Sequence, residues 1–137
     1  RDLKPGNIML RNDGSLALID FGLAKHVLRS SDITAAGTIF GTPFYISPEQ
    51  GHGDEVDARS DLYSLGIIFY ELLMQKRPYN GSSPMNIIYM HRNAPLPQLP
   101  EELMRYEGLL YRMLAKEPKD RFQSAEELLT AIQSLKV

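Results

Sequence analysis

The chain has 137 residues, of which 43% are apolar and 23% charged, the balance of an ordinary soluble globular domain. Its 15 Lys and Arg against 17 Asp and Glu give a net charge of −2, which argues against a nucleic-acid module or a polybasic membrane binder. The absence of cysteine excludes disulfides, thiolate metal sites and cysteine catalysis. No signal-peptide pattern is present, and the longest apolar stretch, 62–74, is too short for a bilayer, which needs about 20 residues. We therefore expect no membrane segment in this chain and a cytoplasmic location, with membrane anchoring of the parent protein through a segment not present here left open.

The first third of the chain predicts strands and loops. Two short apolar runs flank the turn signal at residues 12–15, which predicts a β-hairpin over 8–19. Residues 23–47 show no steady period and are rich in Ser, Thr, Gly and Ala. A loop of this length within a compact domain is typical of a functional or mobile segment.

The remainder predicts helices. Segment 61–75 is apolar on every side, so we expect a helix buried all round. A serine before proline opens a predicted helix over 84–92, and apolar residues follow helical spacing over 103–114. Residues 124–127 form a predicted capping box, followed by an apolar face that runs to residue 135. We interpret these apolar stripes as core packing and assign them no chemistry.

Chemically useful residues gather at the start of the chain. Asp2, Lys4 and Asn7 share one short loop, and Asp20 follows the second predicted strand. The predicted hairpin folds Asp20 back toward Asn7, so two carboxylates, an amide oxygen and an ammonium converge. Phosphoryl transfer needs such groups, because oxygen ligands hold Mg²⁺ on the phosphates, a carboxylate receives the attacking hydroxyl and a cation offsets charge.

With these motifs the chain resembles the C-terminal lobe of a eukaryotic-like protein kinase, and bacterial serine/threonine kinases above all. Residues 1–7 match the catalytic-loop motif from its second residue onward, 20–22 match the Asp-Phe-Gly motif and 47–49 match a serine variant of Ala-Pro-Glu. The similarity continues through 61–66 and 120–121, so it covers nearly the whole chain. It implies a mainly α fold with a small β-hairpin, the C-terminal lobe of the kinase-like α+β fold without its N-terminal lobe.

The resemblance divides this partial kinase domain, residues 1–137, into four parts. These are a catalytic loop, a β-hairpin, the Asp-Phe-Gly motif with the activation segment, and a helical subdomain: 1–7, 8–19, 20–49 and 50–137. It also implies roles for single residues in the first three parts.

Five residues match catalytic and ligand-binding positions of the family. Asp2 matches the aspartate that accepts the substrate hydroxyl proton, and Lys4 the lysine that contacts the γ-phosphate of ATP. Asn7 and Asp20 match the Mg²⁺ ligands. Thr42 matches the threonine that hydrogen-bonds the catalytic Asp and Lys and helps select serine or threonine substrates.

Other matches imply architecture. Glu49 and Arg121 match a buried ion pair that anchors the end of the activation segment. Asp61 matches the residue that caps the buried helix and ties its start to the catalytic-loop backbone. Phe21 and Gly22 complete the Asp-Phe-Gly motif and are assigned a structural role.

The loop 23–47 is a candidate for regulation by phosphorylation. In the family, an arginine where Arg1 stands marks enzymes whose activation loop is ordered by a phosphate. Thr38, four residues before Thr42, matches the usual site, and Thr34 is the second candidate. Lys25 matches a second basic residue that can face the same phosphate, and a phosphothreonine would add about −1.5 to −2 charge there.

The three histidines carry no predicted chemistry. His26, His52 and His91 are scattered and share no metal-ligand spacing, so we interpret all three as surface residues. The predicted helix 84–92 has no acidic residue, so it gives no support for a preference for basic substrates.

The expected activity is transfer of the ATP γ-phosphate to Ser or Thr hydroxyls of protein substrates, with ATP and Mg²⁺ as cofactors. Autophosphorylation through a kinase–kinase dimer is a further expectation, and no nucleic-acid partner is expected. The Gly-rich loop, the strand lysine and the helix glutamate of a kinase are missing from this sequence. We therefore expect a piece of a longer kinase that is inactive alone.

Two other functions stay open. A small-molecule phosphotransferase of the aminoglycoside or choline kinase type also uses an Asp-Leu-x-Pro-x-Asn loop, but lacks motifs such as Ser-Pro-Glu. A non-enzymatic pseudokinase or interaction module usually loses a catalytic aspartate or a metal ligand, and both kinds of residue are present here. The sequence upstream of Arg1 would discriminate best.

Overall fold

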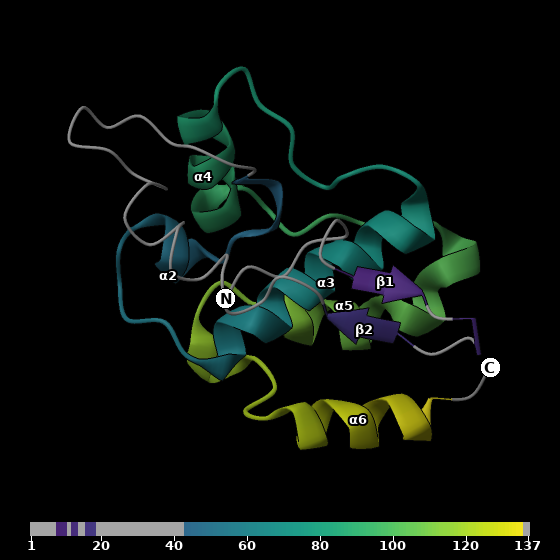
Figure 1. The fold of residues 1–137 in the computed structure, drawn as a ribbon. Helices are drawn as coiled ribbons and strands as arrows, with labels where there is room; N and C mark the ends of the chain where they lie inside the picture. Colours follow the sequence, from purple (N-terminus) through teal and green to yellow (C-terminus); the bar gives the residue numbers. More distant parts are fainter. Residues whose placement is uncertain (1–7, 11, 14–15, 19–42, 136–137) are drawn as a thin grey trace.

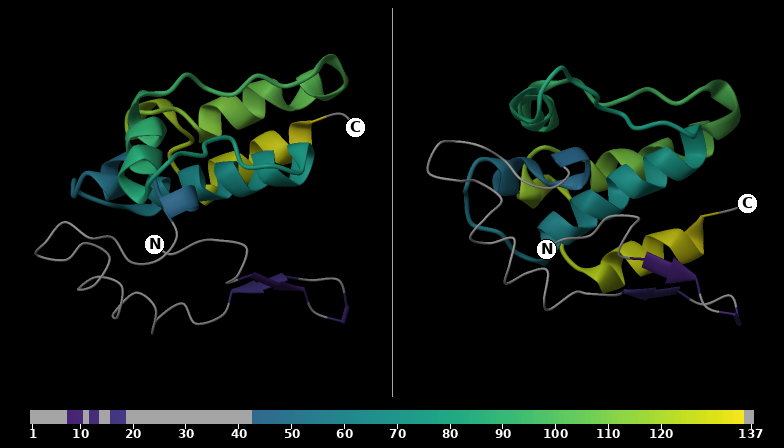
Figure 2. Two further views of the ribbon diagram at one scale, coloured as in Figure 1. Left: turned by 90° about the horizontal axis from the view of Figure 1, so that it is seen from above. Right: turned by 45° about the horizontal axis from the view of Figure 1, so that its top comes forward.

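The structure is a computed structural model that describes residues 8–10, 12–13, 16–18 and 43–135. Near the N-terminus, strands β1 (Ile8–Leu10) and β2 (Leu16–Leu18) pair antiparallel, with Ile8 opposite Leu18 and Leu10 opposite Leu16. The predicted hairpin over 8–19 is therefore confirmed. Figure 2 shows this hairpin to one side of the helices.

The helical part forms a small bundle around one central helix (Figure 1). Its α-helices are α2 (Pro48–Gly51), α3 (Ala58–Met74), α4 (Pro84–Asn93), α5 (Glu107–Met113) and α6 (Ala125–Ser134). The 3₁₀ turn η2 (Pro43–Tyr45) precedes α2, η3 (Glu101–Tyr106) lies between α4 and α5, and η4 (Pro118–Asp120) lies between α5 and α6. The expected class, mainly α with one small hairpin, is confirmed.

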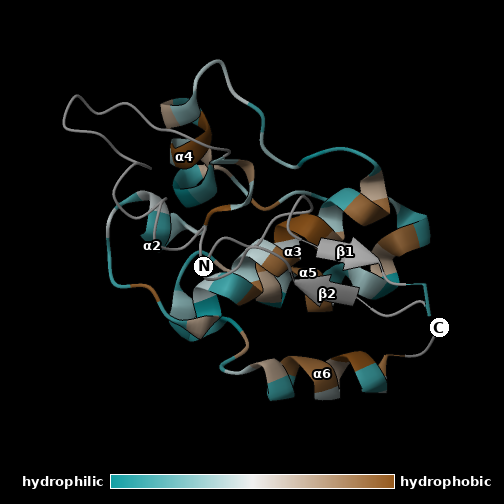
Figure 3. Ribbon diagram, viewed as in Figure 1, coloured by the Kyte–Doolittle hydropathy of each residue, from teal (hydrophilic) through white to brown (hydrophobic). Residues whose placement is uncertain are grey.

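Among the described elements, helix α3 contributes the largest share of the core. Tyr63 and Ile67 are fully buried and pack with the apolar residues of α5, which runs beside α3. Gly66 permits this approach, because a Cβ there would lie 2.9 Å from Leu114 and from Met113. Hydrophobic residues run along this central helix in Figure 3. The helix was expected to be buried all round, and this is wrong at its C-terminal end, where Leu72 is 69% exposed.

The start of α3 also differs from expectation. The helix begins at Ala58, three residues before the predicted start, because Asp57 caps it: its carboxylate accepts a hydrogen bond from the Arg59 N–H at 2.8 Å. Asp61 lies inside the first turn, so the prediction that Asp61 caps the helix is wrong. Its expected tie to the catalytic-loop backbone involves residues 1–7, which lie outside the described residues.

The serine caps of the other two long helices are confirmed. Ser83 Oγ accepts from the Asn86 N–H at 3.1 Å, and Ser124 Oγ from the Glu127 N–H at 3.0 Å. The second half of the predicted capping box differs, because the Glu127 carboxylate accepts from the N–H of Gln123, one residue before the cap. In the part of the chain that the structure describes, no helix has the length and apolar character to cross a bilayer.

Candidate functional site

The structure describes three of the residues that the sequence singled out: Glu49, Asp61 and Arg121. Eleven others lie outside the described residues: Arg1, Asp2, Lys4, Asn7, Asp20, Phe21, Gly22, Lys25, Thr34, Thr38 and Thr42. Their convergence and their roles stay predictions. The described part instead shows how residues 43–49, the segment that follows Thr42, are held in place.

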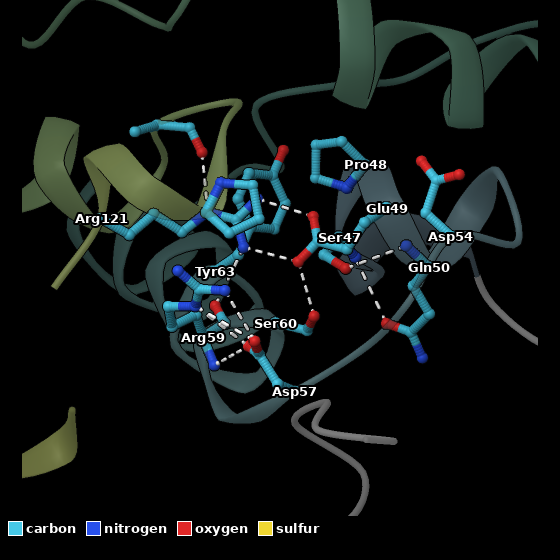
Figure 4. A network of polar contacts seen from close by, with 12 residues as sticks. Ser47, Pro48, Glu49, Gln50, Asp54, Asp57, Arg59, Ser60, Tyr63 and Arg121 are labelled. Carbon is cyan, nitrogen blue, oxygen red and sulfur yellow. Dashed lines mark hydrogen bonds and ion pairs between the residues drawn. The ribbon is translucent and has the colours of Figure 1, made fainter. Parts of the chain in front are cut away.

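Glu49 and Arg121 form a buried, bidentate ion pair (Figure 4). The distances are 2.7 Å from Arg121 Nη1 to Glu49 Oε2 and 2.8 Å from Nη2 to Oε1. Ser60 on α3 donates its hydroxyl to Glu49 Oε2 at 2.5 Å. Arg121 is 1% exposed and Glu49 6%. We call Glu49, Ser60 and Arg121 the carboxylate anchor, because together they join α2, α3 and the turn after η4.

The Arg121 guanidinium uses all five of its N–H donors. Besides the two bonds to Glu49, Nε donates to the Ala115 carbonyl, Nη1 to that of Arg59 and Nη2 to that of Lys116, at 2.8, 3.0 and 3.1 Å. A buried charge is tolerated when its hydrogen-bonding capacity is satisfied in this way. Lysine, with three donors and no planar fork, cannot reproduce the set.

The electrostatics keep Glu49 ionised. Burial alone would raise the pKa of its carboxyl, but the hydrogen bonds from Arg121 and Ser60 outweigh it and hold the pKa below the ordinary value. The residues of the predicted ion pair thus lie together, as the family resemblance implied. The pair contacts no reacting group in the described part of the chain. Its role is structural, because it joins α2 to the turn after η4.

The turn η2 is held by a second set of contacts, through the side chains of Phe44 and Tyr45. The Arg77 guanidinium lies 4.0 Å from the centre of the Phe44 ring, a cation–π contact. The Tyr45 hydroxyl donates to the Glu71 carboxylate at 2.5 Å and accepts from Arg77 Nε at 3.5 Å. Sequence analysis did not single out Arg77 or Glu71, because neither belongs to a recognisable motif.

His91 on α4 corrects one of the predictions. It was expected at the surface, but it is fully buried and touches Tyr63 and the backbone of Pro43. Its spacing carried a signal that was missed, since it follows Ile87 by four residues and Ile88 by three, on the buried face of α4. His52 is exposed, as expected, and His26 lies outside the described residues.

No described cluster of three or more His, Asp or Glu side chains is arranged to hold a metal ion. The predicted Mg²⁺ ligands, Asn7 and Asp20, lie outside the described ranges. The hairpin register does bear on them: Asn7 directly precedes Ile8, Asp20 follows Leu18 by two residues, and Ile8 and Leu18 are paired. The two predicted ligands therefore stand, in the sequence, beside paired residues of the hairpin.

Comparison with known proteins agrees with this architecture. The model of the protein kinase domain family matches residues 1–132. The serine/threonine-protein kinase PknB of Mycobacterium leprae is 41% identical over 136 residues, which cover 93% of this chain and 21% of that protein. PknB of Mycobacterium tuberculosis is 41% identical over 137 residues, with the same two coverages. A probable serine/threonine-protein kinase of Streptomyces coelicolor is 40% identical over 139 residues, 98% of this chain and 21% of its own length.

The chain belongs to the protein kinase domain family. The resemblance to bacterial serine/threonine kinases is confirmed by these relatives. The chain spans about a fifth of the length of the curated relatives it matches.

Proposed function

We propose that this chain is the C-terminal-lobe part of a non-specific protein serine/threonine kinase. The whole enzyme would transfer the γ-phosphate of ATP to serine or threonine hydroxyls of protein substrates. The observation that carries the proposal is the catalytic-loop motif at 1–7, which matches the family from the second residue of the motif onward. The pairing of Ile8 with Leu18 supports the proposal that Asn7 and Asp20 act together. The names of the relatives support a protein kinase over a small-molecule phosphotransferase.

The proposed mechanism assigns one task to each residue. Asp2 accepts the proton of the attacking hydroxyl, and Lys4 offsets charge near the γ-phosphate. Asn7 and Asp20 offer an amide and a carboxylate oxygen, a donor set that suits Mg²⁺. When bound, Mg²⁺·ATP supplies the phosphoryl group with part of its charge neutralised. Thr42 hydrogen-bonds Asp2 and Lys4.

The described part of the chain supports this mechanism by holding residues 43–49, which follow Thr42, in place. The carboxylate anchor holds Glu49, seven residues after Thr42, and the contacts of Phe44 and Tyr45 hold the turn directly after Thr42. Misplacing a catalytic group by about 1 Å can lower the rate about 100-fold. Contacts that fix the neighbouring backbone therefore help to keep the site preorganised.

Kinase assays on the full-length protein test the proposal. We expect Mg²⁺-dependent transfer of labelled phosphate from ATP to a protein substrate, with phosphoserine or phosphothreonine in the product. Asp2→Asn should lower turnover by about 10²–10⁴-fold, the usual cost of losing a general base, while nucleotide binding stays intact. Asp20→Ala should abolish metal-dependent turnover. Unchanged turnover in Asp2→Asn would remove Asp2 from the mechanism, and a wild-type protein with no transfer would favour a pseudokinase.

We propose further that phosphorylation of the loop 23–47 switches the enzyme on. Thr38, or else Thr34, would receive the phosphate in a kinase–kinase dimer, and Arg1 and Lys25 would pair with it through charge-assisted hydrogen bonds. Mass spectrometry of the active full-length protein should find the modification, and Thr38→Ala and Arg1→Ala should lower activity. If neither threonine is ever modified, or both variants keep full activity, the switch is not in this loop. The cytoplasm is the proposed site of the reaction.

The isolated chain of 137 residues is expected to bind ATP weakly or not at all. Its sequence has none of the motifs that hold adenine and the α- and β-phosphates in a kinase. Calorimetric titration of the isolated chain with Mg²⁺·ATP measures this directly. Micromolar binding to a monomeric, folded chain would contradict the division of labour proposed here.

A further inference from the structure

The buried imidazole of His91 joins α3, α4 and η2 through its two nitrogens. Nδ1 lies 2.8 Å from the Tyr63 hydroxyl, and Nε2 lies 3.0 Å from the Pro43 carbonyl oxygen. A carbonyl only accepts, so Nε2 carries the proton and donates it to Pro43. Nδ1 is then the acceptor, and the Tyr63 O–H donates to it. We call the two hydrogen bonds that link Tyr63, His91 and Pro43 the histidine contact.

The surroundings keep this direction of hydrogen bonding fixed. Burial, together with the nearby Lys116 ammonium, lowers the pKa of His91 to about 4, so the ring is neutral near pH 7. Lys116 Nζ donates to the His91 carbonyl at 2.8 Å and to the Tyr79 hydroxyl at 3.1 Å. The rings of Tyr63 and Tyr79 pack edge-on against the imidazole, with centroids 5.6 and 5.2 Å away. A neutral imidazole with one donor and one acceptor satisfies this site fully.

The hydrogen bond to the Pro43 carbonyl matters because Pro43 directly follows Thr42 in the sequence. Phe44 and Tyr45 are held through their side chains, whereas His91 holds the backbone, at the residue that follows Thr42. A proline has a fixed φ and also restricts the residue before it. The bond from His91 therefore fixes the backbone directly after Thr42.

We propose that His91 is a positioning residue for the kinase reaction: through the Pro43 carbonyl it fixes the backbone of residues 43–47, the segment that directly follows Thr42. This proposal rests on the proposed function, because it takes the role of Thr42 from it. His91 itself touches no reacting group in the described part of the chain. Its effect should fall on the protein or peptide acceptor and leave the affinity for ATP unchanged.

Three substitutions at residue 91 separate the two hydrogen bonds. His91→Gln places an amide N–H near the position of Nε2 and can still donate to Pro43. His91→Asn has a shorter side chain that matches Nδ1, so it can bond Tyr63 but cannot reach Pro43. His91→Phe keeps the ring volume and loses both bonds. Leu128→Ala, in the separate core cluster of α6, serves as a control for destabilisation without contact to η2.

The variants are compared in the full-length protein by steady-state kinetics with a peptide substrate. We expect kcat/KM for the peptide to fall by about tenfold or more in His91→Phe and His91→Asn, toward the roughly 100-fold that a 1 Å misplacement can cost. KM for ATP should not change, and His91→Gln should recover most of the loss. Equal effects of Gln and Asn, or a loss no larger than in Leu128→Ala, would overturn the proposal.

Hydrogen–deuterium exchange gives a second readout that does not depend on activity. Amides of residues 44–47 should exchange faster in His91→Phe and His91→Asn than in Leu128→Ala, and near the wild-type rate in His91→Gln. Unchanged exchange at 44–47 in His91→Phe would overturn the proposal even if activity fell. If the wild-type protein transfers no phosphate, the proposed function fails, while this exchange pattern still decides whether His91 fixes the segment.

Discussion

The carboxylate anchor and the histidine contact hold the two ends of one segment, residues 43–49, by opposite means. At the Glu49 end the fastener is a pair of buried charges with every guanidinium donor used. At the Pro43 end it is a neutral imidazole between a hydroxyl and a carbonyl. Tyr63 belongs to both ends, since its hydroxyl bonds His91 and the Arg121 guanidinium lies 4.9 Å from the centre of its ring.

This difference teaches where each end is vulnerable. A buried ion pair fails when one partner is removed, because the other charge is left without compensation. A buried neutral histidine fails when it is forced to take up a proton, because the ion is then desolvated. The two ends should therefore respond to different changes in sequence and solution.

The largest effect is expected at the carboxylate anchor. Arg121→Ala should lower the free energy of unfolding of the complete kinase domain by about 3–5 kcal/mol, because Glu49 and three backbone carbonyls lose their donors. Arg59→Ala is the matched control and should change stability far less, since Arg59 pairs with Asp57 at the surface, where solvent screens an ion pair. Chemical denaturation measures both variants. Equal losses would show that the buried pair is not special.

Hydrophobic replacement of the whole pair sharpens the comparison. Replacing both members of a buried ion pair by apolar residues is often neutral. Here Glu49→Leu combined with Arg121→Met should remain destabilised, because the carbonyls of Arg59, Ala115 and Lys116 still lose their hydrogen bonds from Arg121. Denaturation of the double variant checks this expectation. Full recovery of wild-type stability would mean that those three bonds contribute little.

The histidine contact should be sensitive to pH. The pKa of His91 is lowered from 6.5 to about 4 in the folded protein. Between these two pH values His91 is therefore protonated in the unfolded chain and neutral in the folded one. The free energy of unfolding should therefore have its full value above pH 6.5 and fall as the pH drops toward 4. The expected loss is on the order of 3 kcal/mol, at about 1.4 kcal/mol per pH unit. The Lys116 ammonium faces the ring, and the neighbouring Tyr63 and Tyr79 stay neutral there.

His91→Gln is the control for that pH profile, because it keeps the bond to Pro43 without a titratable ring. Its stability should depend less on pH between 6.5 and 4 than that of the wild-type protein. Glu49 is present in both proteins, and because its pKa is lowered from 4.5, its contribution begins to be lost only near pH 4.5, equally in both. Identical profiles for wild type and His91→Gln would contradict the neutral, buried assignment of His91.

The smallest effect on stability is expected outside both clusters, at the C-terminal end of α3. Leu72 is 69% exposed, and Leu129 and Ile132 on α6 are 54% and 45% exposed. Leu72→Glu should change the free energy of unfolding by no more than about 0.5 kcal/mol, as usual for surface substitutions. It should nevertheless raise the concentration at which the isolated chain stays monomeric in sedimentation. A large loss of stability would show that Leu72 packs after all.

The sequence predicted helices α3, α4, α5 and α6, the hairpin and the Glu49–Arg121 pair, because these depend on local periodicity or on family motifs. It did not predict the short helix α2 or that residues 103–106 form a 3₁₀ turn. The sequence-based prediction was wrong for the cap of α3 and for His91, because both depend on tertiary geometry. Asp57 rather than Asp61 begins α3, since which of two nearby acids reaches the free N–H groups depends on the backbone path before the helix. His91 looked like a lone polar residue, because its partners lie 28 and 48 residues away along the chain.

A double-mutant cycle tests most directly whether the two clusters act as one anchor for residues 43–49. It compares the free energies of unfolding of Arg121→Lys, His91→Phe and the double variant in the complete kinase domain. Because Tyr63 is shared by both clusters, we predict a coupling energy of at least about 0.5 kcal/mol, as found for residues with common partners. Losses that add within about 0.3 kcal/mol, as for independent sites, would contradict the account.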